Sequence, residues 1–190
     1  VAKRAIDIAV SAVLLILLSP LMGAIAILVR LTSKGPVFYR QERMGLDGST
    51  FQMLKFRTMR TDAEAATGAV WAAENDPRRT AFGTFLRKTS LDELPQFFNV
   101  LAGQMSVVGP RPERPVFIRE FRGRIPRYML RHKIKTGITG WAQVNGWRGN
   151  TSLEKRIQYD LYYIENWSIG FDLWIILITP FKGLVSKNAY

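Results

Sequence analysis

One stretch of the sequence carries no charged residue: IAVSAVLLILLSPLMGAIAILV, residues Ile8–Val29. At ~1.5 Å of rise per residue, a straight helix of this length would reach about the thickness of a bilayer core, ~30 Å. We therefore predict a membrane helix at this position, and we expect the rest of the chain to be organised beside a bilayer.

Two features of this segment argue against a simple crossing. Ser19 and Pro20 lie in its middle, where proline removes a backbone hydrogen bond and kinks a helix, and the serine hydroxyl can satisfy a carbonyl freed there. Cations flank both ends and would keep both on the cytoplasmic side: Lys3, Arg4, Arg30, Lys34, Arg40 and Arg43. The residues alone leave both a spanning and a re-entrant helix open.

Composition restricts the chemistry and the partners. The chain has no cysteine and a single histidine, His132, which excludes disulfides and thiolate metal sites and disfavours a Ser/His triad or a multi-histidine zinc site. Catalysis would therefore fall to carboxylates. Lys and Arg number 27 against 15 Asp and Glu, a net charge of +12, which indicates a polyanionic partner such as nucleic acid, phospholipid or a nucleotide.

An acid pair, Asp92 and Glu93, follows two cations within the segment LRKTSLDELPQ, Leu86–Gln96. Ser90 and Glu93 fit a capping box, and Asp92 would suit the positive end of a helix dipole. Alternatively, a partly desolvated carboxylate can be a nucleophile or a metal ligand. We expect nearby amides and cations to favour the ionised form of Asp92. Local spacing does not decide between the two interpretations.

Basic residues stand at three further marked positions. Lys55 and Arg57 are two apart on a predicted strand, Phe51–Met59, so they share a face that is either a solvated surface or a two-pronged phosphate clamp. Arg111 lies between two prolines that fix the backbone and aim its guanidinium, a group suited to bidentate phosphate binding. Arg148 lies in a stretch dense in glycine and aromatic residues, Thr136–Gly149.

Nine Lys or Arg residues lie between Arg111 and Lys135, with only two acids among them. Nucleic-acid binding is one interpretation. The run lacks an RNP-type or helix-turn-helix pattern, and the preceding membrane segment makes anionic headgroups the simpler explanation. The last apolar run, Phe171–Phe181, is too short to span, and we predict a helix lying in the interface plane.

Four blocks of the sequence together resemble the bacterial sugar transferase family, the monotopic phosphoglycosyl transferases. The resemblance covers essentially the whole chain, and the blocks follow the order of the family: Lys55–Met59, Leu86–Gln96, Val108–Pro112 and Gly140–Gly146.

The resemblance implies a membrane enzyme that moves a sugar 1-phosphate from a UDP-sugar to undecaprenyl phosphate and releases UMP, which initiates exopolysaccharide, capsule or O-antigen assembly. Asp92 would be the nucleophile that forms a covalent phosphosugar intermediate, and Glu93 would orient it, help bind Mg²⁺ or manage a proton. Substrate-binding cations would be Lys55, Arg57, Arg87, Arg111 and Arg148. Glucose or galactose is favoured as the sugar, because the sequence around Asn145–Gly149 looks closest to that of hexose-transferring members with longer chains.

The resemblance also implies a re-entrant helix at Ser19 and Pro20. We therefore expect an α+β fold, mainly helical with a small antiparallel β-hairpin, in which residues 1–33 form the re-entrant membrane helix and residues 34–190 a membrane-associated catalytic domain on the cytoplasmic face of the bacterial inner membrane. The start at Val1, directly on the membrane segment, suggests the C-terminal part of a longer protein. No nucleic-acid partner is expected, and a homodimer is one open option. The alternative is a non-enzymatic polybasic membrane adaptor.

The re-entrant topology predicts that probes placed at Lys3 and at Lys34 react only from the cytoplasmic side. Membrane-impermeant labelling of sealed vesicles of both orientations measures this. Labelling of the two positions from opposite sides would contradict the re-entrant helix.

Overall fold

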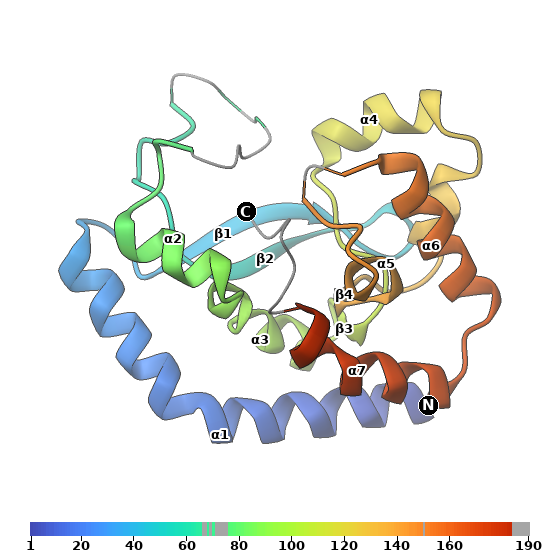
Figure 1. Cartoon of the computed structure of the whole chain (residues 1–190), viewed down its shortest axis with the longest axis horizontal. Helices are drawn as coiled ribbons and strands as arrows, with labels where there is room; N and C mark the ends of the chain where they lie inside the picture. The colour runs from blue at the N-terminus through green and yellow to red at the C-terminus, as the bar shows by residue number, and fades with distance from the viewer. Residues whose placement is uncertain (66–67, 69, 71–75, 150, 184–190) are drawn as a thin grey trace.

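The apolar segment forms one long helix, α1 (Ala2–Thr32), in the computed structural model, which describes residues 1–65, 68, 70, 76–149 and 151–183. Residues 184–190 of the predicted catalytic domain lie outside the described residues. Figure 1 shows α1 bent near its middle. Pro20 lies inside the helix, and the Ser19 hydroxyl donates to the Ile16 carbonyl at 2.8 Å, as expected where proline interrupts the backbone ladder.

Polar contacts hold the first half of α1 to the rest of the molecule. Lys3 Nζ lies 2.6 Å from Asp172 Oδ2. The buried Asp7 carboxylate accepts hydrogen bonds from Ser106 Oγ and the Val107 amide, both at 2.9 Å. A buried carboxylate needs such donors, so these contacts fix the register of α1 against the domain.

The second half of α1 is held by apolar packing instead. Ile25 and Val29 are buried in a cluster with Phe56 and Leu86. Both ends of α1 therefore contact the same folded body.

Between these anchors, α1 exposes apolar side chains. Among the described residues it is the one helix long and apolar enough to cross a membrane, and only 11% of its most apolar window is buried. The exposed large side chains include Ile8, Val13, Ile16, Leu17, Leu21, Ile27, Leu28 and Leu31. Helix α7 (Ile169–Gly183) runs beside α1 in Figure 1 and adds Leu173, Trp174, Leu177 and Phe181.

Two small sheets carry the loops that hold Arg57 and Arg111. Strands β1 (Phe38–Met44) and β2 (Thr50–Phe56) form the predicted antiparallel hairpin, with the turn at η1 (Leu46–Gly48). Strands β3 (Ser106–Val108) and β4 (Gly137–Thr139) pair in parallel, which the sequence analysis did not predict. A side chain at Gly137 would overlap the backbone of Gly109, so this close approach requires glycine.

Short helices fill the space around these sheets, and the α+β, mainly helical class is confirmed. Their bounds are α2 (Ala81–Lys88), η2 (Leu91–Glu93), α3 (Gln96–Leu101), α4 (Pro115–Arg124), η3 (Tyr128–His132), α5 (Trp141–Val144) and α6 (Leu153–Glu165). The main core gathers buried residues of β2, α3, β3 and α7, among them Met53, Val100, Val107 and Ile175. Asp172, which interrupts the apolar run of α7, is buried against Lys3, and the helix continues past it.

The buried His132 gives folding a pH dependence. Burial, with the neighbouring Arg131, lowers the pKa of His132 to about 4 from 6.5. Between these values the unfolded chain binds more protons, so stability is lost as the pH falls from about 7 towards 4, by up to about 3 kcal/mol. Thermal unfolding in detergent at several pH values should show a smaller acid-dependent loss for His132→Phe than for the parent; equal losses would contradict this assignment.

Candidate active site

Asp92 and Glu93 lie on η2, a single turn between α2 and α3. The capping-box hypothesis is wrong: Ser90 makes no side-chain cap, and its φ of 57° places it in the left-handed region. The Ser90 hydroxyl accepts a hydrogen bond from Arg148 instead, at 3.2 Å. Both carboxylates face cations from other segments, Lys55 on β2 and Arg111 after β3, and do not cap their own helix.

Glu93 is the electrostatic centre of the site. Its Oε1 accepts from Lys55 Nζ at 2.8 Å and from Arg111 at 2.5 Å, and its Oε2 accepts from Arg111 at 3.2 Å. Burial opposes ionisation, but Arg111 and Lys55 together hold the pKa of Glu93 well below its ordinary value. The two cations therefore favour the ionised form of Glu93.

Asp92 is held less tightly. Its Oδ2 lies 3.7 Å from Lys55 Nζ, and it accepts no hydrogen bond from the described residues. Burial raises the pKa of Asp92; Lys55 opposes the shift and Glu93 adds to it. The expectation that amides and cations would favour the ionised form of Asp92 is wrong in direction, because desolvation outweighs them.

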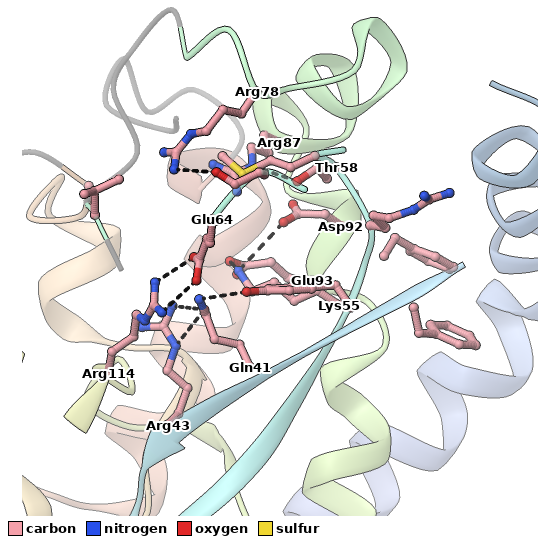
Figure 2. Close-up of a pocket in the computed structure, with 18 of the residues that line it drawn as sticks. Gln41, Arg43, Lys55, Thr58, Glu64, Arg78, Arg87, Asp92, Glu93 and Arg114 are labelled. Atoms are coloured by element: carbon pink, nitrogen blue, oxygen red, sulfur yellow. Dashed lines mark hydrogen bonds and ion pairs between the residues drawn. The ribbon is translucent and has the colours of Figure 1, made fainter. Parts of the chain in front are cut away.

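The site opens into a cavity of about 400 Å³ (Figure 2). All seven residues proposed from the sequence line it: Lys55, Arg57, Arg87, Asp92, Glu93, Arg111 and Arg148. They come from β2 and its following loop, α2, η2, the turn after β3 and the loop after α5, so the tertiary structure gathers segments that are far apart in the chain.

Arg57 does not form the two-pronged clamp with Lys55. Its guanidinium donates to the Ser33 carbonyl at 2.9 Å and to the Lys34 carbonyl, which ties it to the end of α1. The Lys55 ammonium reaches Glu93 instead. Strand β2 ends at Phe56, so Arg57 lies beyond the regular strand in which the two side chains would share a face.

Two cations in the cavity have hydroxyl partners. Arg87 Nε donates to Thr58 Oγ1 at 2.9 Å, and Arg148 donates to Ser90 Oγ. A hydroxyl orients a guanidinium without neutralising it, and within the described part of the chain neither residue forms a salt bridge. Arg87 and Arg148 therefore retain charge for an anionic ligand.

Buried ion pairs hold the turn that carries Arg111. Arg131, which is fully buried, donates to the Arg111 carbonyl at 3.0 Å and pairs with Asp160 at 2.7 Å. Arg156 pairs with Glu113 at 2.9 Å on the same turn. Part of the basic run after Arg111 is thus structural.

Several residues line the cavity besides those predicted from the sequence. Tyr39, Gln41 and Arg43 alternate along β1 and line the cavity together, a pattern that the period of a strand could have indicated. Glu64 and Arg114 also line it. Arg114 lies within the basic run that we associated with headgroups, and no local signal distinguished it.

Asp92 and Glu93 differ in their suitability as metal ligands. The described residues contain no group of three or more acidic or histidine side chains suited to a metal ion. Mg²⁺ is commonly held by one or two carboxylates together with substrate phosphates. Asp92 fits this role, whereas both oxygens of Glu93 accept hydrogen bonds from Lys55 or Arg111, so a metal ion at Glu93 would share these oxygens with the two cations.

A buried carboxylate pair in a cationic cavity, attached to an exposed apolar helix, is the arrangement of a membrane-associated protein that handles phosphate compounds. The family model "Bacterial sugar transferase" matches residues 1–186, and the chain belongs to this family.

Three relatives illustrate the family. A UDP-glucose:undecaprenyl-phosphate glucose-1-phosphate transferase of Escherichia coli (strain K12) is 52% identical over 99% of this chain and 41% of its own length, and one of Klebsiella pneumoniae is 56% identical over 99% and 41%. An exopolysaccharide production protein of Rhizobium leguminosarum bv. phaseoli is 43% identical over 100% of this chain and 98% of its own. The chain thus spans about two fifths of the first two relatives.

Replacing Glu93 by alanine should destabilise the fold, because it leaves the largely buried Lys55 and Arg111 without their shared partner. Breaking a buried pair costs about 3–5 kcal/mol. Thermal or urea unfolding in detergent measures the loss. The exposed Glu42→Ala on β1 is the control and should change stability little; an unfolding midpoint for Glu93→Ala equal to that of the parent would contradict the central role of Glu93.

Proposed function

We propose that this chain transfers glucose 1-phosphate from UDP-glucose to undecaprenyl phosphate, releases UMP and initiates exopolysaccharide synthesis. The observation that carries the proposal is the buried Asp92–Glu93 pair in a cationic cavity beside the apolar α1. The printed names of the Escherichia coli and Klebsiella relatives supply the substrates, and they favour glucose over galactose.

The reaction proceeds through two displacements at one phosphorus. An Asp92 oxygen attacks the β-phosphorus of UDP-glucose, an O–P bond forms, and the bond from that phosphorus to the bridging oxygen breaks, so UMP leaves with the electron pair. A phosphate oxygen of the lipid then attacks the same phosphorus and expels the Asp92 carboxylate. One site thereby serves two phosphate substrates in turn.

The other cavity residues prepare Asp92 for this chemistry. Glu93 fixes Lys55 within 3.7 Å of Asp92, and Lys55 offsets the repulsion between a carboxylate and a phosphate group. Arg87 and Arg148, which have hydroxyl partners, bind the phosphate oxygens of the substrates, and Arg111 holds Glu93 in place. Bound Mg²⁺, held by Asp92 and the substrate, would neutralise further phosphate charge.

The proposal includes a re-entrant α1 in the bacterial inner membrane, with the domain on the cytoplasmic face. Contacts at both ends of α1 with one folded body support it, since a spanning helix would place Asp7 and Val29 near opposite surfaces of the bilayer. The apolar face of α7 would then lie in the interface plane, so the cavity can receive both a soluble nucleotide and a lipid phosphate.

The polybasic adaptor remains the competing function, and the placement of the basic run after Arg111 argues against it. An adaptor needs its exposed cations beside the apolar surface. Arg119, Arg122 and Arg124 are exposed on α4, which Figure 1 places on the other side of the hairpin from α7 and the first half of α1.

Replacing Asp92 by asparagine should lower UMP release from UDP-glucose by at least about 10³-fold, because the amide cannot act as the nucleophile. The assay uses detergent micelles with undecaprenyl phosphate and Mg²⁺. Asp47→Asn, which alters a surface carboxylate paired with Lys133, is the matched control and should keep activity. Near-normal turnover of the Asp92 variant would refute the nucleophile, whereas normal vesicle binding by a parent without transferase activity would favour the adaptor.

A further inference from the structure

Arg114 and Glu64 form a two-point ion pair at the wall of the cavity. The two terminal nitrogens of Arg114 donate to the two carboxylate oxygens of Glu64 at 2.8 and 3.0 Å (Figure 2). A guanidinium binds phosphate through the same pair of parallel hydrogen bonds. The Glu64 carboxylate therefore occupies Arg114 in the way that a phosphate group would.

The turn after β3 thus presents two arginines, three residues apart, that each hold a carboxylate. Arg111 holds Glu93, whose side chain is 9% exposed, whereas Arg114 holds Glu64, whose side chain is 37% exposed. Exposed ion pairs contribute roughly 0–1 kcal/mol, while breaking a buried one is costly. Glu64 can therefore be exchanged for another anion, and Glu93 cannot.

The surroundings of Arg114 favour a second anion. Arg43 and Arg111 line the same cavity. Burial lowers the pKa of Arg43 to about 10; Glu113 opposes the shift, and the nearby Arg111 and Arg114 add to it. Like charges gathered in one cavity repel each other, and an anionic ligand among them relieves that repulsion.

The position of Arg114 indicates which substrate it meets. Arg114 immediately precedes α4, which lies away from α7 and the first half of α1 (Figure 1). Its guanidinium lies 5.9 Å from the ring centre of Phe117, and the partly exposed Tyr39 lines the same cavity. A lipid phosphate would arrive from the apolar surface of α1 and α7, whereas Arg114 lies on the α4 side of the cavity, and aromatic rings suit a nucleoside base.

We propose that Arg114 binds the phosphate of the nucleotide substrate that remains on the leaving UMP, and that Glu64 occupies Arg114 until the nucleotide displaces it. The identity of the ligand rests on the proposed function. Glu64 then acts as an internal competitor: it keeps Arg114 oriented in the empty site, and it returns when UMP leaves.

Calorimetric titration of the whole chain in detergent with UMP tests this exchange. Glu64→Gln removes the competing charge and should tighten UMP binding about two- to fivefold. Arg114→Ala removes a charged two-point contact and should weaken it at least about tenfold. Glu120→Gln, which breaks an exposed pair with Arg124 on the same helix, is the matched control and should leave UMP binding unchanged.

The double variant separates exchange from a general charge effect. In the Arg114→Ala background, Glu64→Gln should no longer tighten UMP binding. Unchanged or weaker UMP binding by Glu64→Gln alone, or tightening that persists without Arg114, would overturn the inference.

Two further measurements distinguish the ligand and the underlying function. Titration with farnesyl phosphate should respond little to either substitution; a response there and not with UMP would overturn the nucleotide assignment. Transfer assays of the parent run in parallel. Transfer activity without the UMP shifts would refute the exchange alone, whereas the UMP shifts without transfer from any UDP-sugar would refute the proposed function and still support nucleotide binding at Arg114.

Discussion

The Glu93 carboxylate is the contact on which the arrangement of the site depends. It accepts hydrogen bonds from Lys55 on β2 and from Arg111 on the turn after β3, so three segments distant in the chain meet at one pair of oxygens. Without this anion, two largely buried cations would repel each other beside Asp92. The same contact holds Lys55 beside the buried Asp92, with its ammonium 3.7 Å from Asp92 Oδ2.

A second set of contacts joins the apolar helix to this site. Asp7 accepts from the Val107 amide in β3, and β3 leads directly into the turn that carries Arg111. Just beyond the far end of α1, Arg57 donates to the carbonyls of Ser33 and Lys34 while its side chain lines the cavity. The apolar helix is therefore part of the scaffold of the site, and a displacement at either end of α1 would be transmitted to the cavity wall.

The excess of basic residues serves several purposes, which explains why net charge alone left the partner open. Arg131 and Arg156 are buried in ion pairs that hold the Arg111 turn. Arg57 binds the carbonyls that follow α1, whereas Arg87 and Arg148 lie in the cavity with hydroxyl partners. The net charge of +12 includes all of these residues, and only the positions of the side chains show which cations can contact a phosphate group.

The sequence by itself determined the helices and strands that depend on residues close together in the chain. The apolar run specifies α1, Pro20 interrupts its hydrogen-bond ladder, and the glycine-containing turn specifies the β1–β2 hairpin. The spacing of the motifs and the family resemblance also identified seven residues that line the cavity. Tertiary structure decided the remainder: the parallel pairing of β3 with β4, the partners of Ser90 and Arg57, the direction of the Asp92 pKa, and the ion pair of Arg114 with Glu64. Each of these depends on burial or on a partner far along the chain, and neither quantity is encoded in a local pattern of residues.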